Sequence, residues 1–500
     1  MICVIIACGS HRRMIEEHQK LAEDGIELVE LRLDFLRKEP EIYRLLPNRP
    51  TNVIVTIRRR EDGGQWRDTE DRRQRILRSV IADGVEFVDL ELDIAKKIPR
   101  FGSTKRIISY HNLEETPENL DLLRDELLKC DADIVKIAVT PKNINDVYRM
   151  IEFLKRVNKP GVSVPTLGIS MTELGAMTRL LGKKYGAPFG FASFSETRTI
   201  APGMMYYKTL RDLYRYENVD SHTEVFGVVG DPIGHSLSPL IHNASFGALN
   251  LNKIYLPFRM PGEELSPFID RAQEIDLKGL SVTIPHKVAV IKKLTQLDPA
   301  VEEIDACNTI ILDGYSRFGY NTDYLAAVLS IETAMGLNPD GTSPLDGKKA
   351  LVLGAGGAGK AIAFGLIEKG ARVIISDIKD EMAEKLANQL HCDFCTWETR
   401  NSYVVQILAN CTPVGMFPNV NETPMERSAL RGGMFVFDAV YNPENTLLLK
   451  QARDKGCTTI SGIEMFVGQA CLQFKLFTGR KASASFMRGL VKKTLSPVHD

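Results

Sequence analysis

The stretch Asp133-Ile134-Val135-Lys136-Ile137-Ala138-Val139 has the composition of a buried β-strand with a lysine at its centre. Lys136 has no obvious partner within its own strand. Desolvation disfavours the charged ammonium form, which leaves a primary amine available as a Schiff-base nucleophile. A lysine at a frayed strand end would explain this segment equally well, so the neighbouring strands must decide between the two interpretations.

Residues 1–195 contain eight apolar runs that we expect to form strands. Polar, helix-compatible stretches such as 72–82 and 143–156 separate them. Eight strands that alternate with helices over about 200 residues are typical of a (β/α)8 TIM barrel. The expected strands are 2–7, 28–34, 52–58, 86–93, 106–111, 133–139, 163–171 and 189–194.

Polar side chains interrupt five of these strands with a period of two. Side chains two residues apart lie on the same face of a strand, so each set shares one face. Most of them occur late in their strands, at the end where barrel enzymes carry their chemistry. A solvated face would explain one such strand but not five, so the pattern predicts an active site. Its members are Glu30, Arg32, Asp34, Thr56, Arg58, Asp89, Glu91, Asp93, Ser109, His111 and Lys136.

Five segments that carry these residues resemble the type I 3-dehydroquinate dehydratases in order and spacing. They are 30–34, 56–58, 89–92, 109–112 and 133–136, and the likeness covers most of residues 1–215. The resemblance implies that Lys136 forms an imine with the C3 ketone of 3-dehydroquinate. It further implies that His111 removes the C2 proton and then protonates the departing hydroxyl, while Glu91 orients the imidazole.

The same resemblance implies which side chains hold the substrate. Arginine suits a bidentate grip on carboxylate, and the residues that would hold the hydroxyls and the carboxylate are Glu30, Arg32, Arg58 and Arg179. The last barrel loop departs from the family, which usually has Ser-Ala-Pro-Gly-Gln where this chain has Ile200-Ala201-Pro202-Gly203-Met204. Because the Schiff-base residues are intact, we expect activity with weaker or altered substrate binding. An inactive first half is the alternative.

The second half contains a glycine-rich turn between an expected strand, 348–354, and an expected helix that runs through 369. A further strand is expected at 371–377. The turn reads Gly354-Ala355-Gly356-Gly357-Ala358-Gly359, which is Gly-x-Gly-x-x-Gly in its strand–turn–helix context. Such glycines let backbone amides approach a pyrophosphate at a helix N-terminus. The sequence therefore predicts a Rossmann-type nucleotide-binding domain.

Segments around this turn resemble the shikimate dehydrogenases over about residues 225–490. They are 230–239, 281–287, 307–309, 319–323 and 464–470. A carboxylate beside an amine can tune and orient it, so Lys287 and Asp323 form a plausible proton relay. By resemblance, Gly462 contacts the cofactor, and the shikimate pocket is lined by Ser236, Ser238, Thr283, Asn308, Tyr441 and Gln469. The whole chain resembles the fused dehydroquinate dehydratase–shikimate dehydrogenases of plants and some bacteria.

The expected cofactor is NAD(P)H, and the choice between its two forms depends on the end of the second nucleotide-binding strand. The family usually has Asn-Arg-Thr there, with the arginine on the 2′-phosphate of NADP(H), whereas this chain has Ser376-Asp377-Ile378-Lys379. Asp377 lies 18 residues past Gly359, where a carboxylate accepts hydrogen bonds from a free ribose 2′-hydroxyl. It would repel a 2′-phosphate, although Lys379 could partly compensate. We therefore favour NAD(H) over NADP(H), the family default.

Composition agrees with a large soluble enzyme, which we expect to be cytoplasmic, and we expect no metal cofactor. With 44% hydrophobic residues and a net charge of −1, the 500-residue chain has no electrostatic bias toward nucleic acid or membrane. Nine cysteines without regular spacing argue for reduced thiols. The expected domains are 1–219, 225–335 completed by a C-terminal helix at about 463–495, and 345–460, with the charged linker 211–224 after the barrel.

The favoured function is a bifunctional enzyme of aromatic biosynthesis that dehydrates 3-dehydroquinate to 3-dehydroshikimate and reduces the product to shikimate. Two alternatives remain. One is an enzyme of quinate catabolism that runs the oxidation. The other is a metabolite-sensing regulator on the same folds. Such a regulator could lose its catalytic residues, so the presence of Lys136, His111, Lys287 and Asp323 disfavours it. The sequence leaves the oligomeric state, the direction of flux and channelling of the intermediate undecided.

Overall fold

The computed structural model describes residues 1–336, 338 and 341–495. The chain divides into two compact units. The first holds Met1–Val225 and Asn250–Leu277, and the second holds Phe226–Leu249 and the chain from Lys278 onward. Compact units need not coincide with functional domains, so the predicted domain boundaries stay predictions.

Eight parallel strands build the first unit in the order β7-β6-β5-β4-β3-β2-β1-β8. Strand neighbours follow the chain, and the last strand returns to pair with the first. This confirms the predicted (β/α)8 barrel. Seven strands fall inside their predicted runs, and β5 extends its run by one residue at each end. The strands are β1 (Ile2–Ile6), β2 (Leu28–Arg32), β3 (Asn52–Thr56), β4 (Phe87–Glu91), β5 (Lys105–Asn112), β6 (Ile134–Val139), β7 (Thr166–Ser170) and β8 (Gly190–Ser193).

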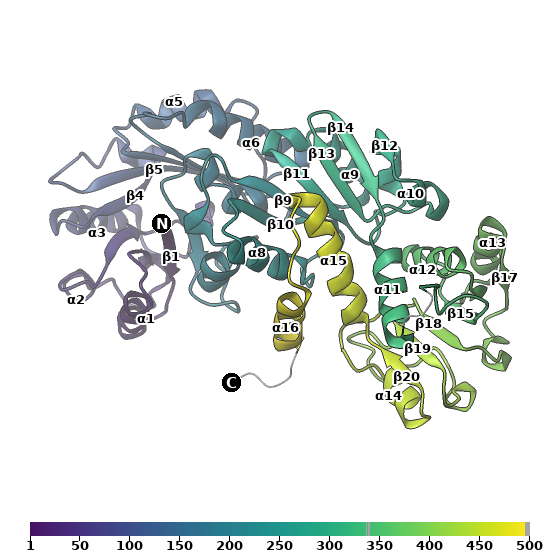
Figure 1. The fold of residues 1–500 in the computed structure, drawn as a ribbon. Coiled ribbons are helices and arrows are strands. Elements are labelled where there is room, and N and C mark those ends of the chain that lie inside the picture. The colour runs from purple at the N-terminus through teal and green to yellow at the C-terminus, as the bar shows by residue number, and fades with distance from the viewer. Residues whose placement is uncertain (337, 339–340, 496–500) are drawn as a thin grey trace. The chain divides into compact units, whose positions relative to one another are not determined.

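Helices follow the barrel strands and lie outside them, as α3 and α5 do in Figure 1. Their lengths differ widely, and α4 is a single turn. The helices are α1 (His11–Glu23), α2 (Ile42–Leu45), α3 (Glu70–Ala82), α4 (Leu92–Ala95), α5 (Leu120–Leu128), α6 (Ile144–Val157) and α7 (Ala176–Leu180).

The inward faces of the strands form an apolar cluster that fills the barrel. Its members include Ile134 and Ala138 of β6 and Phe191 of β8. Lys136 lies midway between Ile134 and Ala138, and side chains two residues apart share a face. Lys136 therefore points into the barrel, and the buried-strand interpretation of its segment is confirmed.

The segment after β10 (Lys253–Arg259) packs against the barrel helix α6. It comprises α9 (Gly262–Asp270) and a short 3-10 turn, Ala272–Ile275. Tyr148 of α6 is fully buried and donates a hydrogen bond to the Phe268 carbonyl at 2.9 Å. The guanidinium of Arg271 lies 4.7 Å from the centre of the same ring. This segment thus covers the outer side of the helix that follows the Lys136 strand.

The predicted linker is itself folded onto the barrel. Residues Tyr216–Asn218 form a 3-10 turn, and Tyr216 is fully buried. A Cβ at position 190 would lie 2.6 Å from the Tyr216 ring, so the ring occupies space that glycine leaves free. The stretch is charged in sequence, yet it anchors the end of the barrel because of this one aromatic side chain.

The second unit contains two sheets. One is mixed and includes, in order, β9 (Glu224–Gly230), β11 (Leu277–Val282), β13 (Thr309–Asp313), β14 (Ser316–Tyr320) and β12 (Gln296–Leu297). The other is parallel, with the order β17-β16-β15-β18-β19-β20, which is the strand order of a Rossmann fold. Its strands are β15 (Lys349–Leu353), β16 (Arg372–Ser376), β17 (Asp393–Phe394), β18 (Ile407–Asn410), β19 (Phe435–Asp438) and β20 (Thr458–Ile460).

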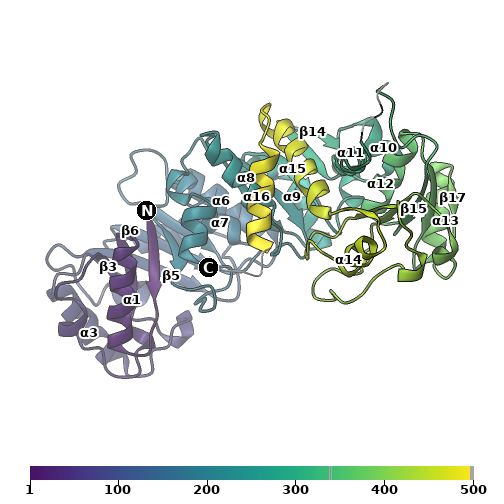
Figure 2. The ribbon, with the colours of Figure 1, turned by 60° about the horizontal axis from the view of Figure 1, so that its bottom comes forward.

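The second unit also contains helices in addition to its two sheets. The two C-terminal ones, α15 and α16, lie side by side in Figures 1 and 2. The helices are α8 (Ser238–Ala248), α10 (Pro299–Ile304), α11 (Asp323–Met335), α12 (Gly357–Glu368), α13 (Asp380–Leu390), α14 (Leu447–Asp454), α15 (Gly462–Thr478) and α16 (Ala484–Leu495). Of the helices in the described part of the chain, none is both long and apolar enough to cross a membrane.

Candidate active sites

Lys136 has partners on three other strands of the barrel. Its Nζ donates a hydrogen bond to Oδ2 of Asp89 on β4 at 3.0 Å. Oε1 of Glu30 on β2 lies 3.9 Å away, and the centre of the Phe191 ring lies 4.4 Å away. The lysine that lacks a partner in its own strand therefore sits beside two carboxylates and an aromatic face.

Arg58 connects the two carboxylates of β4. Its Nη2 pairs with Oδ1 of Asp89 at 2.8 Å, and its Nη1 donates to Oε1 of Glu91 at 2.7 Å. The second oxygen of Glu91 accepts from Nη1 of Arg73 at 2.8 Å. Ser109 of β5 donates to Asp89 at 2.5 Å. The polar face predicted from period two is thus one connected network inside the barrel.

His111 lies among the charges of this network. Burial, followed by the positive charges of Arg58 and Lys136, holds the pKa of His111 well below its usual value. Its Nδ1 is buried and has no hydrogen-bond partner among the described residues. Both oxygens of Glu91 bind arginines, so the orientation of His111 by Glu91 stays a prediction.

The predicted substrate arginines differ in their partners. Arg32 binds Asp34 through two hydrogen bonds of 2.9 and 2.8 Å, and Arg58 is bound as above. Arg179 of α7 is buried, its Nε has no partner among the described residues, and no ion pair joins it to them. Burial without an opposing carboxylate lowers the pKa of Arg179 to about 10. Arg179 is therefore the predicted substrate residue whose charge is left uncompensated.

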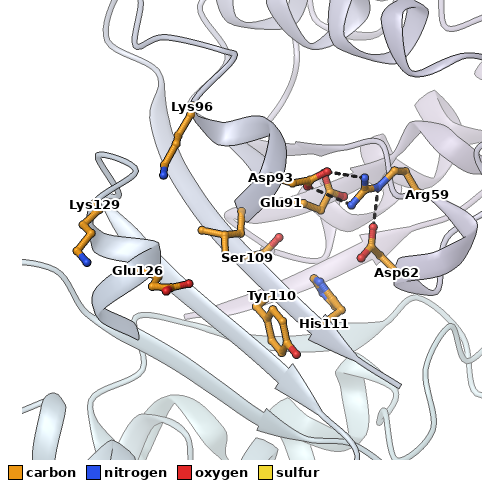
Figure 3. A pocket seen from close by; sticks show the side chains of 11 residues that line it. Arg59, Asp62, Glu91, Asp93, Lys96, Ser109, Tyr110, His111, Glu126 and Lys129 are labelled. Carbon is orange, nitrogen blue, oxygen red and sulfur yellow. Dashed lines mark hydrogen bonds and ion pairs between the residues drawn. The ribbon is translucent and has the colours of Figure 1, made fainter. Parts of the chain in front are cut away.

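A polar pocket of about 660 Å³ opens beside His111 at the ends of β4 and β5. Figure 3 shows His111 at the same end of the pocket as Glu91 and Asp62, whereas Lys96, Glu126 and Lys129 lie at the other end. His111 is therefore one of the residues that line a pocket.

The unusual last barrel loop contributes apolar contacts. Ile200 and Met204 are partly buried and pack against the apolar cluster inside the barrel. They therefore place hydrocarbon where the dehydratase family usually places a hydroxyl and an amide. The consequence for substrate binding stays a prediction.

The second unit brings Lys287 and Asp323 together. Nζ of Lys287 donates to Oδ2 of Asp323 at 2.6 Å, although the two residues are 36 positions apart. A Cβ built on Gly357 would lie 3.3 Å from Cδ of Lys287, so the lysine stem lies at the glycine-rich turn. The predicted relay pair is thus assembled next to the nucleotide-binding helix.

Asn308 lies in a buried network beside this pair. Its Nδ2 donates to Oγ1 of Thr322 at 3.0 Å, and its Oδ1 accepts from the Thr322 amide at 2.8 Å. Gln473 of α15 donates to the Asn308 carbonyl at 3.2 Å and to Oγ1 of Thr309 at 2.9 Å. The network holds Asn308 against Thr322, the residue that precedes the helix beginning with Asp323.

The other predicted pocket residues come from four segments of the second unit. The amide of Ser238 donates to Oγ of Ser236 at 3.3 Å. Gln469 donates to the Phe466 carbonyl at 2.9 Å, and the Tyr441 ring stacks on Phe466 with ring centres 4.8 Å apart. Thr283 follows β11 and is half-buried. Their contact with substrate stays a prediction.

The glycine-rich turn has the backbone that a dinucleotide requires. A Cβ on Gly359 would lie 1.8 Å from the Gly354 carbonyl, so only glycine fits there. Asp377 follows β16, and its carboxylate accepts hydrogen bonds from the amides of Ala355 at 2.7 Å and Lys379 at 2.9 Å. Ile378 is 76% exposed. Gly356 and Ala358 flank Gly357 at the start of α12, and Gly462 begins α15.

Several residues of these sites escaped assignment from sequence. The polar face of β4 indicated Asp89, but nothing indicated that it contacts the lysine of β6. Gln473 lies one helical turn after Gln469, and that spacing is a weak signal for a shared face. Arg73 had no signal, because a helix arginine is usually solvated.

Family models cover much of the chain. The one described as type I 3-dehydroquinase matches residues 2–221, and the one described as the shikimate dehydrogenase substrate binding domain matches 228–310. A third, described as the shikimate 5′-dehydrogenase C-terminal domain, matches 462–492. Fold and sites thus define an enzyme with a dehydratase barrel joined to a nicotinamide-dependent dehydrogenase.

One relative spans nearly the whole chain. The bifunctional 3-dehydroquinate dehydratase/shikimate dehydrogenase, chloroplastic, of Arabidopsis thaliana is 37% identical over 505 residues, which cover 96% of this chain and 82% of the relative. The chain belongs to this family of bifunctional 3-dehydroquinate dehydratase/shikimate dehydrogenases, and the predicted enzyme class is confirmed.

Solved structures match the dehydrogenase half. A shikimate dehydrogenase in complex with NADP+ is 34% identical with a TM-score of 0.52, over 56% of this chain and 98% of that one. A quinate dehydrogenase from Corynebacterium glutamicum in complex with NAD is 27% identical with a TM-score of 0.50, over 54% of this chain and 99% of that one. The coarse expectation of a nicotinamide cofactor is thereby confirmed, and its finer identity is not.

Proposed function

We propose that the barrel dehydrates 3-dehydroquinate to 3-dehydroshikimate and that the second unit reduces this product to shikimate. The observation that carries the first step is Lys136, whose Nζ lies inside the barrel 3.0 Å from Asp89. The buried, unpaired guanidinium of Arg179 supports a substrate that brings its own carboxylate.

The dehydration follows from the arrangement of these groups. Nζ of Lys136 attacks the C3 ketone, and the oxygen leaves as water, so an iminium forms. The iminium withdraws electrons from C2, and the neutral imidazole of His111 removes a proton from C2. The same imidazole then returns the proton to the departing C1 hydroxyl. Hydrolysis of the imine releases the product and regenerates the lysine, with a net loss of one water from the substrate.

Substrate binding uses groups at the carboxyl ends of the strands. Arg179 would hold the carboxylate with two hydrogen bonds, because guanidinium matches carboxylate geometry. Arg58 and Glu30 would bind hydroxyls while they keep their present partners. Arg32, already bound to Asp34 through two hydrogen bonds, would offer its remaining donors.

The second unit fits a nicotinamide dinucleotide. The close approach of Gly359 to Gly354 and the free amides at the start of α12 suit a pyrophosphate. The cofactor, when bound, supplies the hydride to the ketone. Lys287 would then donate a proton to the forming alkoxide, and Asp323, at 2.6 Å, would keep its ammonium oriented. Ser236, Ser238, Thr283, Asn308, Tyr441 and Gln469 would hold the substrate.

We favour NAD(H) over NADP(H) for this chain. Asp377 stands at the end of β16, where the ribose 2′-hydroxyl is expected, and the exposed Ile378 cannot bind a phosphate. The same preference supports quinate as a second substrate, in an oxidative direction. The paired variant Asp377→Ala/Ile378→Arg should reverse the ratio of kcat/KM values for the two cofactors. An unchanged ratio would remove the support for this assignment.

The proposed function is tested with the purified full-length chain, 3-dehydroquinate, and NADH or NADPH in parallel. Enone absorbance reports the first step, and nicotinamide oxidation reports the second. Lys136→Met should abolish enone formation but leave oxidation of shikimate intact, and Lys287→Met should do the reverse. Enone formation by Lys136→Met would refute the Schiff-base assignment. Quinate in place of shikimate tests the alternative substrate.

We further propose a cytoplasmic location. All nine cysteines are free, which suits a reducing compartment.

A further inference from the structure

Asp89 is a buried carboxylate of the barrel that several side chains hold in place. It is 1% exposed and binds three side chains. Oδ2 accepts from Lys136 at 3.0 Å, whereas Oδ1 accepts from Ser109 at 2.5 Å and pairs with Arg58 at 2.8 Å. These partners fix the position of the Asp89 carboxylate and therefore its distance from Nζ of Lys136.

Asp89 also keeps its charge. Burial raises the pKa of this carboxyl, but the charges of Arg58, Lys136 and His111 and the hydrogen bond from Ser109 outweigh burial and hold the pKa well below its usual value. The lowered pKa favours the ionised form of Asp89 beside the lysine. What it can supply is a negative charge of constant size.

The proposed chemistry needs such a charge. An ammonium and a ketone give an iminium and one water: two of the three Nζ protons leave with the ketone oxygen, and the iminium keeps the third. Nζ thus carries one positive charge before and after the step. Because Lys136 is buried, that charge requires a counter-ion close to Nζ.

We infer that Asp89 is the counter-ion of the Lys136 Schiff base. It fixes the position of Nζ beside the substrate ketone, and it offsets the positive charge of the iminium that acts as the electron sink. This inference rests on the proposed function, because it assigns the charge partner of the same covalent intermediate.

Other titratable and charged groups around Nζ define the competing explanations. They come from β1, β2, β4 and β5, and β8 contributes the Phe191 ring. Glu30 is the single other carboxylate within 4 Å of Nζ among the described residues, and it accepts from Thr56 at 2.6 Å. Among the described residues, Cys3, Glu30, Asp89 and His111 interact with Lys136, whereas Arg32 and Arg58 act on His111, and Glu91 binds Arg58.

The test measures trapping of the intermediate across a pH series. Full-length protein is mixed with 3-dehydroshikimate and sodium borohydride, which reduces the iminium, and the modified peptide is found by mass spectrometry. Asp89→Asn keeps the size of the side chain and removes its charge. Loss of an opposite charge this close should move the alkaline limb of trapping, which reports the iminium, to lower pH by about 1 to 3 pH units. The acid limb of kcat/KM should move the same way, because the charge of Asp89 also acts on His111. Glu30→Gln should move them less.

Two controls separate folding from charge. The first control is shikimate oxidation, which reports that the second unit of the same molecule is intact. The second control is Asp89→Glu, which keeps the charge and should restore both limbs toward their parental pH. If Asp89→Asn does not fold, Asp89→Ala with added formate replaces it, and formate should restore the limbs.

The outcomes distinguish the two proposals. No trapping at Lys136 in the unaltered protein would refute the Schiff-base function and with it this inference. A second outcome would refute the counter-ion role alone. In that case the unaltered protein is trapped at Lys136, but the pH limbs of Asp89→Asn do not move, or move no more than those of Glu30→Gln.

Discussion

Replacing Arg179 by methionine should make the barrel more stable and its substrate binding weaker. The guanidinium is buried, and burial lowers its pKa from 12.5 to about 10. Each tenfold change in that protonation equilibrium is worth about 1.4 kcal/mol, so the native protein carries a cost of about 3 kcal/mol for this charge. The cost is fully present at neutral pH, because it disappears only as the pH rises above the folded-state pKa.

Methionine has a similar length and needs no hydrogen bonds, so Arg179→Met should recover much of that energy. For a unit of this size, about 3 kcal/mol corresponds to a rise of about 6–12 °C in the melting temperature. Two lost charge-assisted hydrogen bonds to the substrate carboxylate are worth about 3 kcal/mol or more, so KM for 3-dehydroquinate should rise at least about 100-fold.

The assay combines thermal unfolding without ligand and initial rates of enone formation. Arg179→Lys is the matched control: it keeps the charge, so it should gain no stability, and it lacks the planar fork, so KM should still rise. Shikimate oxidation should be unaffected in both variants. A lower melting temperature for Arg179→Met would show that the guanidinium is paired in the free protein. An unchanged KM would show that Arg179 does not bind the substrate carboxylate. Either result would refute this reasoning.

Three further outcomes are expected. Because burial and the neighbouring charges hold the pKa of His111 well below its usual 6.5, dehydratase kcat/KM should stay flat through pH 6.5 and fall only in more acidic buffer; a midpoint near 6.5 in a rate–pH series would contradict this. The double variant Ile200→Ser/Met204→Gln should lower KM for 3-dehydroquinate by about tenfold through regained polar contacts, and a higher KM would mean that the apolar contacts themselves bind substrate. Tyr148→Phe should destabilise the first unit by about 1–3 kcal/mol in urea unfolding, because the Phe268 carbonyl loses its buried donor; an unchanged midpoint would argue against that bond.

Sequence periodicity predicted the inward face of the barrel well, because an alternating strand leaves few choices. Once Ile134 and Ala138 are inside, Lys136 must be inside as well. The glycine-rich turn was equally predictable, since its spacing has meaning only between a strand and a helix. Local rules of this kind depend on neighbours in the chain.

The pairing of charges could not be predicted in the same way. Period two puts Asp89 and Glu91 on one face, but whether each binds an arginine, a lysine or a histidine depends on strand tilt and on side chains from helices, such as Arg73. Arg32 illustrates the limit: the family resemblance predicts that it binds substrate, yet a carboxylate two residues away already binds it.

The covering of α6 by residues 262–275 has a consequence for how the polypeptide is made. The ribosome releases all eight barrel strands before it reaches α9, so a nascent barrel has Tyr148 and the amide of Ile144 without the partners that Phe268 and Glu264 later provide. Domains generally begin to fold during synthesis from the N-terminus. Here the first catalytic unit is completed only when part of the dehydrogenase region has been translated. A stop codon after residue 221 would separate the two activities, but it would leave α6 without its contacts to Glu264 and Phe268.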